Sequence, residues 1–279
     1  MKHRSTDIPC ALESRLDRLL TLPRPLYGHA LALPNRAIER RHRHPWAQLS
    51  YAIRGVVEVT TAHARFMAPP LRAVWIPPGQ AHGVRCSADT VIRSLYIDAS
   101  VDPRGSSTCR VLEVGDLLRE LIRAFSAMPI HYDERGAEGR LAAVLLDQLA
   151  LAPEAGLVLP WPQDTRLREV CHALQSHPRN TRTLASYSRA LGVSDKTLSR
   201  LFRQQTGLSF RLWRQRSRLF SALPLLERGD RVTDVAQACG YESMSAFIAA
   251  FRDYMGVTPG EFLSADATGT GHARPGPPL

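Results

Sequence analysis

LASYSRALGVS, residues 184–194, recurs in outline as VTDVAQACGY, residues 232–241. In both copies an apolar residue lies eight positions before the glycine, a small residue lies four before it, and an apolar residue follows it. The small residue lets two helices cross closely, and the glycine takes the positive φ of a tight turn. A further helix is expected after each turn, ending at Gly207 or Gly256. Two such patterns in tandem predict helix-turn-helix units over 183–207 and 232–256, and therefore a DNA-binding module.

The second helix of each unit is expected to turn polar side chains away from the core. In the first unit Ser194 caps this helix, and Leu198, Leu201 and Phe202 point inward. In the second unit Ser243 is the expected cap. Recognition helices of this kind enter the major groove. The candidate DNA-binding residues are Lys196, Thr197, Ser199, Arg200, Arg203, Ser243, Met244, Ser245, Ile248 and Arg252.

The two predicted recognition helices differ in chemistry. Arg and Lys reach O6 and N7 of guanine, and Ser and Thr take a base edge or a phosphate. The first helix is therefore expected to read most of the bases. The second offers Met244, Ile248 and Ala249, which are apolar. This helix is therefore expected either to contact thymine methyl groups or only to position the protein on the DNA through Arg252. These differences predict a DNA site with one strongly and one weakly specified half.

The charge of the chain favours an anionic partner. The net charge is +10, and seven basic residues but no acidic one lie between residues 196 and 226. A basic bias alone indicates a solvated helix face, but its coincidence with the first recognition helix favours phosphate contact, expected of Arg211 and Arg216. The seven are Lys196, Arg200, Arg203, Arg211, Arg214, Arg216 and Arg218.

The N-terminal part has a β pattern that changes to a helical one. Over 26–105 short apolar or alternating runs are separated by turns rich in Pro, Gly and Arg, which predicts a small barrel or sandwich. Apolar residues then recur every three or four positions, which predicts helices over 114–127 and 138–151. After a Pro-rich connector we expect a helix near Leu167–Ser176, capped by Asp164 or Thr165. A longer helix over Ser209–Leu226 should kink or end at Pro224.

A combination of motifs covers roughly residues 165–263. It comprises Ser194–Arg203, Gly207, Gly240–Ser243, Phe247, Phe251, Arg252, Gly256 and Thr258–Phe262. This combination resembles the AraC/XylS family of bacterial transcription regulators, and the run 240–252 looks like the branch that includes nitroimidazole-resistance regulators. In that family the position of Ala249 is usually arginine, and that of Ile248 is usually small or polar. These departures weaken the expectation of base reading by the second unit.

Two histidine-containing segments suggest a binding site in the N-terminal part. HRHPWAQ, residues 42–48, and PPGQAH, residues 77–82, resemble the two motifs of a cupin barrel, with Gln48 where that family has glutamate. Residues two apart in a strand face the same side, so His42 and His44 are expected to point inward. His82 would complete the set, and Gln48 Oε1 would be a weaker fourth ligand. Such donors suit Zn, Fe(II), Mn or Ni.

Two interpretations of these histidines stay open. Arabinose-type sensor domains keep the barrel and often lose the metal, and an amide is a poorer ligand than a carboxylate. Structural or effector-binding histidines are therefore favoured over a divalent transition metal, and no other cofactor is expected. The aromatic residues of this part are either the lining of an effector pocket or ordinary core. They are Trp46, Tyr51, Trp75 and Tyr96.

Together the resemblances imply an α+β chain. An N-terminal arm (1–25) precedes a cupin-like effector barrel (26–105) and a helical segment (106–152) that either forms a dimer seam or covers the barrel. A linker (153–163) leads to an all-α AraC-type DNA-binding domain (164–263) with two helix-turn-helix units, followed by a disordered tail (264–279).

The implied function is sequence-specific transcription regulation under the control of a small-molecule effector, without catalytic residues. The alternative is a metal-dependent cupin enzyme or metal sensor fused to a DNA-binding domain. A third possibility is a regulator that binds no effector and whose activity depends only on the amount of the protein. The expected partners are double-stranded promoter or operator DNA, the effector, a second copy of the chain in a homodimer and, for an activator, RNA polymerase. The absence of an apolar signal-peptide core or membrane-length segment and five scattered cysteines predict a cytoplasmic location.

Overall fold

The computed structural model describes residues 21–32, 38–86 and 90–268. Residues 1–20 of the expected arm and 269–279 of the expected tail lie outside these ranges. Helix α10 spans Pro259–Thr268, so the helical domain continues five residues beyond the expected boundary at 263. No helix in the described part of the chain is long and apolar enough to cross a membrane.

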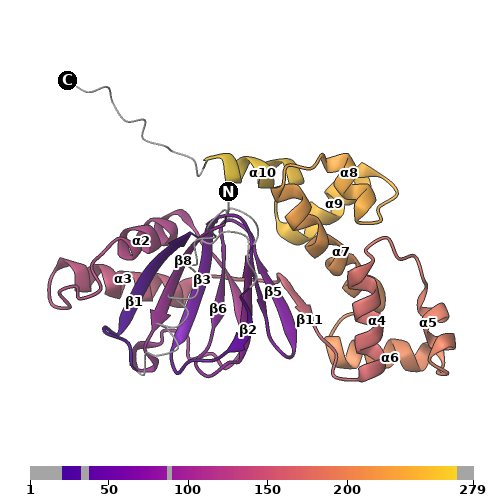
Figure 1. Ribbon diagram of the computed structural model, residues 1–279, viewed down its shortest axis with the longest axis horizontal. Helices are drawn as coiled ribbons and strands as arrows, with labels where there is room; N and C mark the ends of the chain where they lie inside the picture. The colour runs from indigo at the N-terminus through magenta and orange to yellow at the C-terminus, as the bar shows by residue number, and fades with distance from the viewer. Residues whose placement is uncertain (1–20, 33–37, 87–89, 269–279) are drawn as a thin grey trace, which may run out of the picture.

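The N-terminal part consists of two antiparallel sheets (Figure 1). The first has the order β1 (Leu26–Ala32), β8 (Val91–Ile97), β3 (Ala47–Arg54), β6 (Arg72–Ile76), β9 (Arg110–Glu113) and β10 (Glu154–Ala155). The second has the order β11 (Val158–Pro160), β5 (Ala64–Ala68), β4 (Val57–Thr60), β7 (His82–Cys86) and β2 (Ile38–His42). Among the described residues no ladder closes one sheet on the other, so the cupin-like domain is an open pair of sheets rather than a closed barrel.

The sheets extend well beyond the expected limit at residue 105. Strand β9 lies within the segment expected to be helical, and β10 and β11 lie within the expected linker, where they pair with β9 and β5. These strands are only two to four residues long, too short to show a sequence period. Pro160 is tolerated because β11 is an edge strand. The connector is therefore part of the sheet domain.

Two helices cover the outer face of the first sheet, α2 (Asp116–Ser126) and α3 (Ala137–Leu151). Between them and the sheet lies an apolar core that includes Leu49, Trp75, Ile122 and Leu145, all fully buried. A short 3-10 turn, η1 (Ala99–Val101), follows β8. The helices thus pack on the sheet as well as on each other.

The C-terminal part is helical and lies beyond β11 (Figure 1). Its elements are α4 (Thr165–Ser176), α5 (Leu184–Ala190), α6 (Asp195–Thr206), α7 (Phe210–Glu227), α8 (Val232–Ala238), α9 (Met244–Met255) and α10. Asp164 caps α4. Pro224 does not end α7, which continues for three further residues. Pro224 has no N–H to donate to the Phe220 carbonyl, so α7 continues past it without that one hydrogen bond.

One apolar cluster runs from the sheets into the helical part. Val59 and Val84 of the second sheet, Leu159 of β11, and Trp213 and Phe220 of α7 all belong to it. Because the cluster is continuous, the connector strand is held by side chains on both of its sides.

Candidate functional site

The first helix-turn-helix unit, α5 and α6, is fixed at its turn and at both ends of its second helix. Ser188 is the buried small residue four positions before the turn glycine, and its hydroxyl donates to Asp195 Oδ1 at the start of α6. Ser194 Oγ accepts from the Thr197 backbone N–H at 3.1 Å. Gly207 ends α6 with a φ of 71°. The orientation of α6 relative to α5 therefore follows from local hydrogen bonds.

The outward face of α6 carries the basic residues that the sequence predicts. Leu198 and Phe202 are buried, at 2% and 0% exposure, and Leu201 is half-buried. Thr197 is half-buried beside the N-cap, and the exposed residues are Lys196, Ser199, Arg200 and Arg203. This face has the charge and donors that a recognition helix needs in a major groove.

The second unit, α8 and α9, repeats the caps but presents a different face. Ser243 Oγ accepts from the Ala246 backbone N–H at 3.2 Å, and Gly256 ends α9 with a φ of 80°. Of the predicted contact residues Ser243, Met244, Ser245 and Arg252 are exposed. Ile248 is half-buried and packs against the apolar cluster, so only part of its side chain faces outward.

Only part of the basic run faces outward. Arg214 and Arg218 donate to backbone carbonyls of the loop between α4 and α5, at distances between 2.9 and 3.3 Å. The Arg216 guanidinium lies 4.8 Å from the centre of the Tyr254 ring. Arg211 is exposed. The expected phosphate contact therefore fits Arg211 and not Arg216, because Arg216 is held in a half-buried aromatic contact.

Three histidines of the cupin-like domain converge, as their motif spacing predicts. His42 ends β2, His44 follows it and His82 begins β7; one ring nitrogen of each lies within 4.8 Å of the other two. The ring centres are 4.3 Å apart for His42 and His82, and 5.2 Å apart for His44 and His82. His82 is fully buried, and the other two are half-buried.

The hydrogen bonds of two of these three rings select one tautomer. Each ring places Nδ1 against a backbone carbonyl two residues away, at 3.3 Å for His42, 2.7 Å for His44 and 2.9 Å for His82. A carbonyl only accepts, so in the neutral forms of His42 and His82 Nδ1 carries the proton and Nε2 keeps its lone pair, whereas His44 has an acceptor oxygen against each ring nitrogen. Burial lowers the pKa of His82 to about 4 and also lowers the pKa of His44. His82 Nε2 is buried without a hydrogen-bond partner.

Gln48 lies beside only one of the three rings. Its Oε1 is 2.9 Å from His44 Nε2, and its amide N–H donates to Ser50 Oγ at 3.0 Å. An amide oxygen only accepts, so this contact leaves no free lone pair on His44 Nε2. His42 and His82 offer Nε2 lone pairs, and His44 can join them in a donor set that suits a divalent transition metal once its Nε2 leaves Gln48, since a backbone partner on Nδ1 is the usual support of a metal-binding imidazole.

The four candidate pocket aromatics do not share one face. The Trp46 ring stacks on His44 with centres 5.4 Å apart, and Tyr96 meets His44 edge-on at 6.3 Å. Tyr51 and Trp75 instead belong to the core beneath α2 and α3. Strand residues alternate between the two faces of a sheet, which separates these pairs. The predicted pocket is corrected accordingly: only Trp46 and Tyr96 flank the histidines.

The chain is similar to known regulators over most of its length. The family model for the AraC-like ligand binding domain matches residues 25–152, and a helix-turn-helix domain model matches residues 187–265. The HTH-type transcriptional regulator NimR of Escherichia coli K12 is 34% identical over 223 residues, which cover 80% of this chain and 81% of that protein. This chain belongs to the AraC family of transcription regulators.

Other similarities of this AraC-family regulator are more partial. The arabinose operon regulatory protein of Escherichia coli K12 is 33% identical over 133 residues, 45% of this chain and 46% of that protein. Among solved structures, ToxT from Vibrio cholerae covers 88% of this chain and 98% of its own, with 13% identity and a TM-score of 0.37. A DNA-binding transcriptional dual regulator from Escherichia coli K-12 covers 37% and 93%, with 31% identity and a TM-score of 0.34.

The joint between the two parts of this AraC-family regulator uses residues that no motif marks. The Tyr254 hydroxyl, on α9, donates to the carbonyls of Gly156 and Val158 at 3.0 and 3.1 Å. The Trp213 indole N–H, on α7, donates to the Pro160 carbonyl at 2.7 Å. Burial raises the pKa of Tyr254 to about 12, so its hydroxyl stays a donor. The sequence offers no signal for these contacts, because a hydrogen bond to a backbone carbonyl leaves no sequence pattern.

Proposed function

We propose that this AraC-family regulator recognises a promoter or operator mainly through α6, and that a small molecule held by its N-terminal domain alters that recognition. The exposed basic face of α6 on a capped helix-turn-helix unit carries this proposal. An effector can act only if it binds one arrangement of the two parts more tightly than another. The continuous joint between the sheets and α7 and α9 provides a route for such a preference.

Selection of duplexes from a randomised DNA pool with the full-length protein tests the proposal. We expect enrichment of an asymmetric site with one strongly and one weakly specified half, because the exposed residues of α6 are basic and those of α9 are mostly not. Failure to enrich any sequence over the starting pool would contradict sequence-specific binding.

Replacing Arg200 by alanine is expected to weaken binding to the selected duplex by about 1–3 kcal/mol and to relax one base position. Arg200 is exposed on α6, with only a long contact of 3.4 Å to Gln204. Fluorescence anisotropy on the selected duplex and on a shuffled one gives the two affinities. Arg211→Ala is the matched control, since loss of a phosphate contact weakens both duplexes alike. An Arg200→Ala loss of equal size on both duplexes rules out base reading.

We further propose that the regulator is a cytoplasmic homodimer joined through α2 and α3, and that it contacts RNA polymerase if it activates. Three apolar side chains of these helices are exposed, Leu117 at 58%, Val144 at 44% and Leu151 at 74%. Large apolar side chains exposed on two adjacent helices fit an interaction face. Sedimentation equilibrium tests this assembly, and a monomer at micromolar concentration would contradict it.

A second candidate function, metal sensing or a metal-dependent cupin activity, is favoured by the unpartnered Nε2 of His82. His42, His44 and His82 would hold a divalent ion, and the ion would supply Lewis acidity to a bound molecule. Around it, this chain places a backbone carbonyl against Nδ1 of each ring and flanks the cluster with Trp46 and Tyr96.

Titration of chelator-treated protein with Zn²⁺ or Co²⁺ is expected to show one ion per chain. His82→Ala should weaken that binding at least tenfold, because it removes one of three ligands; loss of a mere outer-shell partner already costs about 10–100-fold. His131→Ala is the control, since this exposed histidine lies outside the cluster. Isothermal calorimetry and the visible spectrum of Co²⁺ provide the measurements. Equal binding by the two variants would exclude the cluster as the site.

A further inference from the structure

A cavity opens between the two sheets, on the edge nearest the helical domain. Its volume is about 390 Å³, within the range of small-molecule sites. It is lined by residues of β5 and β11 from one sheet and of β9 and β10 from the other. None of the histidine cluster lines it, so it is a separate site.

The lining combines an apolar wall with a charged rim. Phe66, Val111 and Val158 belong to the wall, and all three are also members of the apolar cluster. Arg110 and Glu154 are the charged members of the rim. This composition suits a molecule with an apolar body and one charged or polar end.

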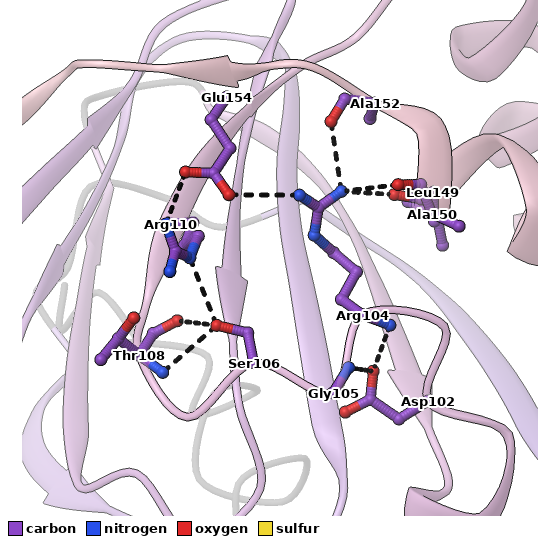
Figure 2. Close-up of polar contacts among 10 residues, drawn as sticks. All are labelled: Asp102, Arg104, Gly105, Ser106, Thr108, Arg110, Leu149, Ala150, Ala152 and Glu154. Carbon is purple, nitrogen blue, oxygen red and sulfur yellow. Dashed lines mark hydrogen bonds and ion pairs between the residues drawn. The ribbon is translucent and has the colours of Figure 1, made fainter.

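The rim has one carboxylate for two guanidinium groups. Figure 2 shows Glu154 between Arg110, whose Nη1 lies 2.6 Å from Oε2, and Arg104, whose Nη2 lies 3.4 Å from Oε1. Arg110 Nε also donates to Ser106 Oγ at 3.3 Å. The Asp102 carboxylate accepts from the backbone N–H of Arg104 rather than from either guanidinium. A second carboxylate would therefore complete the charge balance at Arg110, whose Nη2 donors are not used in these contacts.

The existing ion pair is easily exchanged. The side chains of Arg110 and Glu154 are 42% and 44% exposed, and ion pairs at such exposure contribute little to stability. A ligand carboxylate that reaches Arg110 from inside the cavity can accept from Nη1 in place of Glu154 Oε2, and also from Nη2, while its body is buried against the apolar wall. The ligand thus gains more from this site than Glu154 does.

The strands that carry Glu154 also carry the contacts to the DNA-binding part. Gly156 and Val158 line the cavity, and their carbonyls accept the hydroxyl of Tyr254 on the second recognition helix. Arg104, the other partner of Glu154, donates to the Leu149 and Ala152 carbonyls at the end of α3, at 2.7 and 3.1 Å (Figure 2). Glu154 is therefore connected through Arg104 to the end of α3, and it lies two residues from the first of the carbonyls that contact α9.

We infer that this cavity binds the effector, that the effector is a small carboxylate with an apolar body, and that it acts by taking Arg110 from Glu154. The exchange moves the Glu154 side chain on β10, and Tyr254, which is hydrogen-bonded to the carbonyls of Gly156 and Val158, passes that change to α9. This inference rests on the proposed function, because it names the ligand class and the route of the response.

Benzoate and its neutral counterpart benzamide are suitable probes for the full-length chain. Calorimetry should show benzoate binding, with benzamide weaker by about tenfold or more because it lacks the charge that pairs with Arg110. Arg110→Gln should weaken benzoate by a similar factor. Arg123→Gln, an exposed arginine on α2, is the matched control and should bind as the parent does. No binding of benzoate, or equal binding of benzamide, overturns the ligand class.

The response is measured as the affinity for the selected duplex with and without benzoate. We expect a change of about fivefold or more in the parent protein, which is the lower end of allosteric coupling. Tyr254→Phe, and separately Trp213→Phe, should bind benzoate normally but respond less, because each removes a hydrogen bond across the joint. A full response in both variants overturns the route. Specific DNA binding without any probe is measured in the same series, so failure of the proposed function is seen separately.

Discussion

Replacing Trp213 by alanine is expected to lower the free energy of unfolding by about 3–5 kcal/mol, the usual cost of removing a large buried aromatic side chain. Trp213 has no exposed surface. Its ring contacts Phe202 of α6 and Trp161 of the connector, with centres 6.1 and 6.0 Å apart. Its indole N–H also satisfies the Pro160 carbonyl. The substitution therefore leaves a cavity where α6, α7 and the connector meet.

Trp213→Phe separates the packing contribution from the hydrogen bond. It keeps an aromatic ring and loses the donor to Pro160, so we expect a cost of about 1–3 kcal/mol. Denaturant unfolding followed by far-ultraviolet circular dichroism compares the two variants, because tryptophan fluorescence changes with the substitution itself. A cost of less than 1 kcal/mol for Trp213→Ala would show that the joint is not packed as described.

Gly240→Ala is expected to cost about 2–5 kcal/mol, whereas Gly192→Ala should cost only about 1–2 kcal/mol. Both glycines occupy the turn of a helix-turn-helix unit with positive φ, 76° and 65°, which alone penalises alanine by about 1–2 kcal/mol. A Cβ at Gly240 would also lie 2.8 Å from the Pro178 carbonyl oxygen and 2.9 Å from the Arg179 Cα. At Gly192 no atom lies within 4 Å of that position. The added steric cost at Gly240 is typical of overpacking against backbone.

Denaturant unfolding of the two variants under the same conditions measures this difference. Since both substitutions are identical and occupy equivalent positions, effects of helix propensity and of the unfolded chain largely cancel. Equal losses of stability would mean that the loop before α5 does not pack on the second turn.

The local patterns of the chain were sufficient for the DNA-binding units. The caps at Ser194 and Ser243 and the ends at Gly207 and Gly256 are local features, since each depends on hydrogen bonds within a few residues. The meeting of His42, His44 and His82 was also predicted, because two motifs fix which strand faces they occupy. Short strands such as β10 and β11 were missed, because two or three residues show no period and their pairing is non-local.

Sequence by itself determined that this chain carries two helix-turn-helix units of unequal chemistry, because period, capping and turn chemistry are encoded within short windows, and its motifs resemble those of the AraC family. Only the tertiary structure decided which side chains around these units contact one another. It turned Tyr51 and Trp75 away from the histidines and Arg216 toward Tyr254. It also brought Glu154 between two arginines and joined Tyr254 to β11. These contacts link residues about forty to one hundred positions apart, and at such separations only the packing of the folded chain selects the partner.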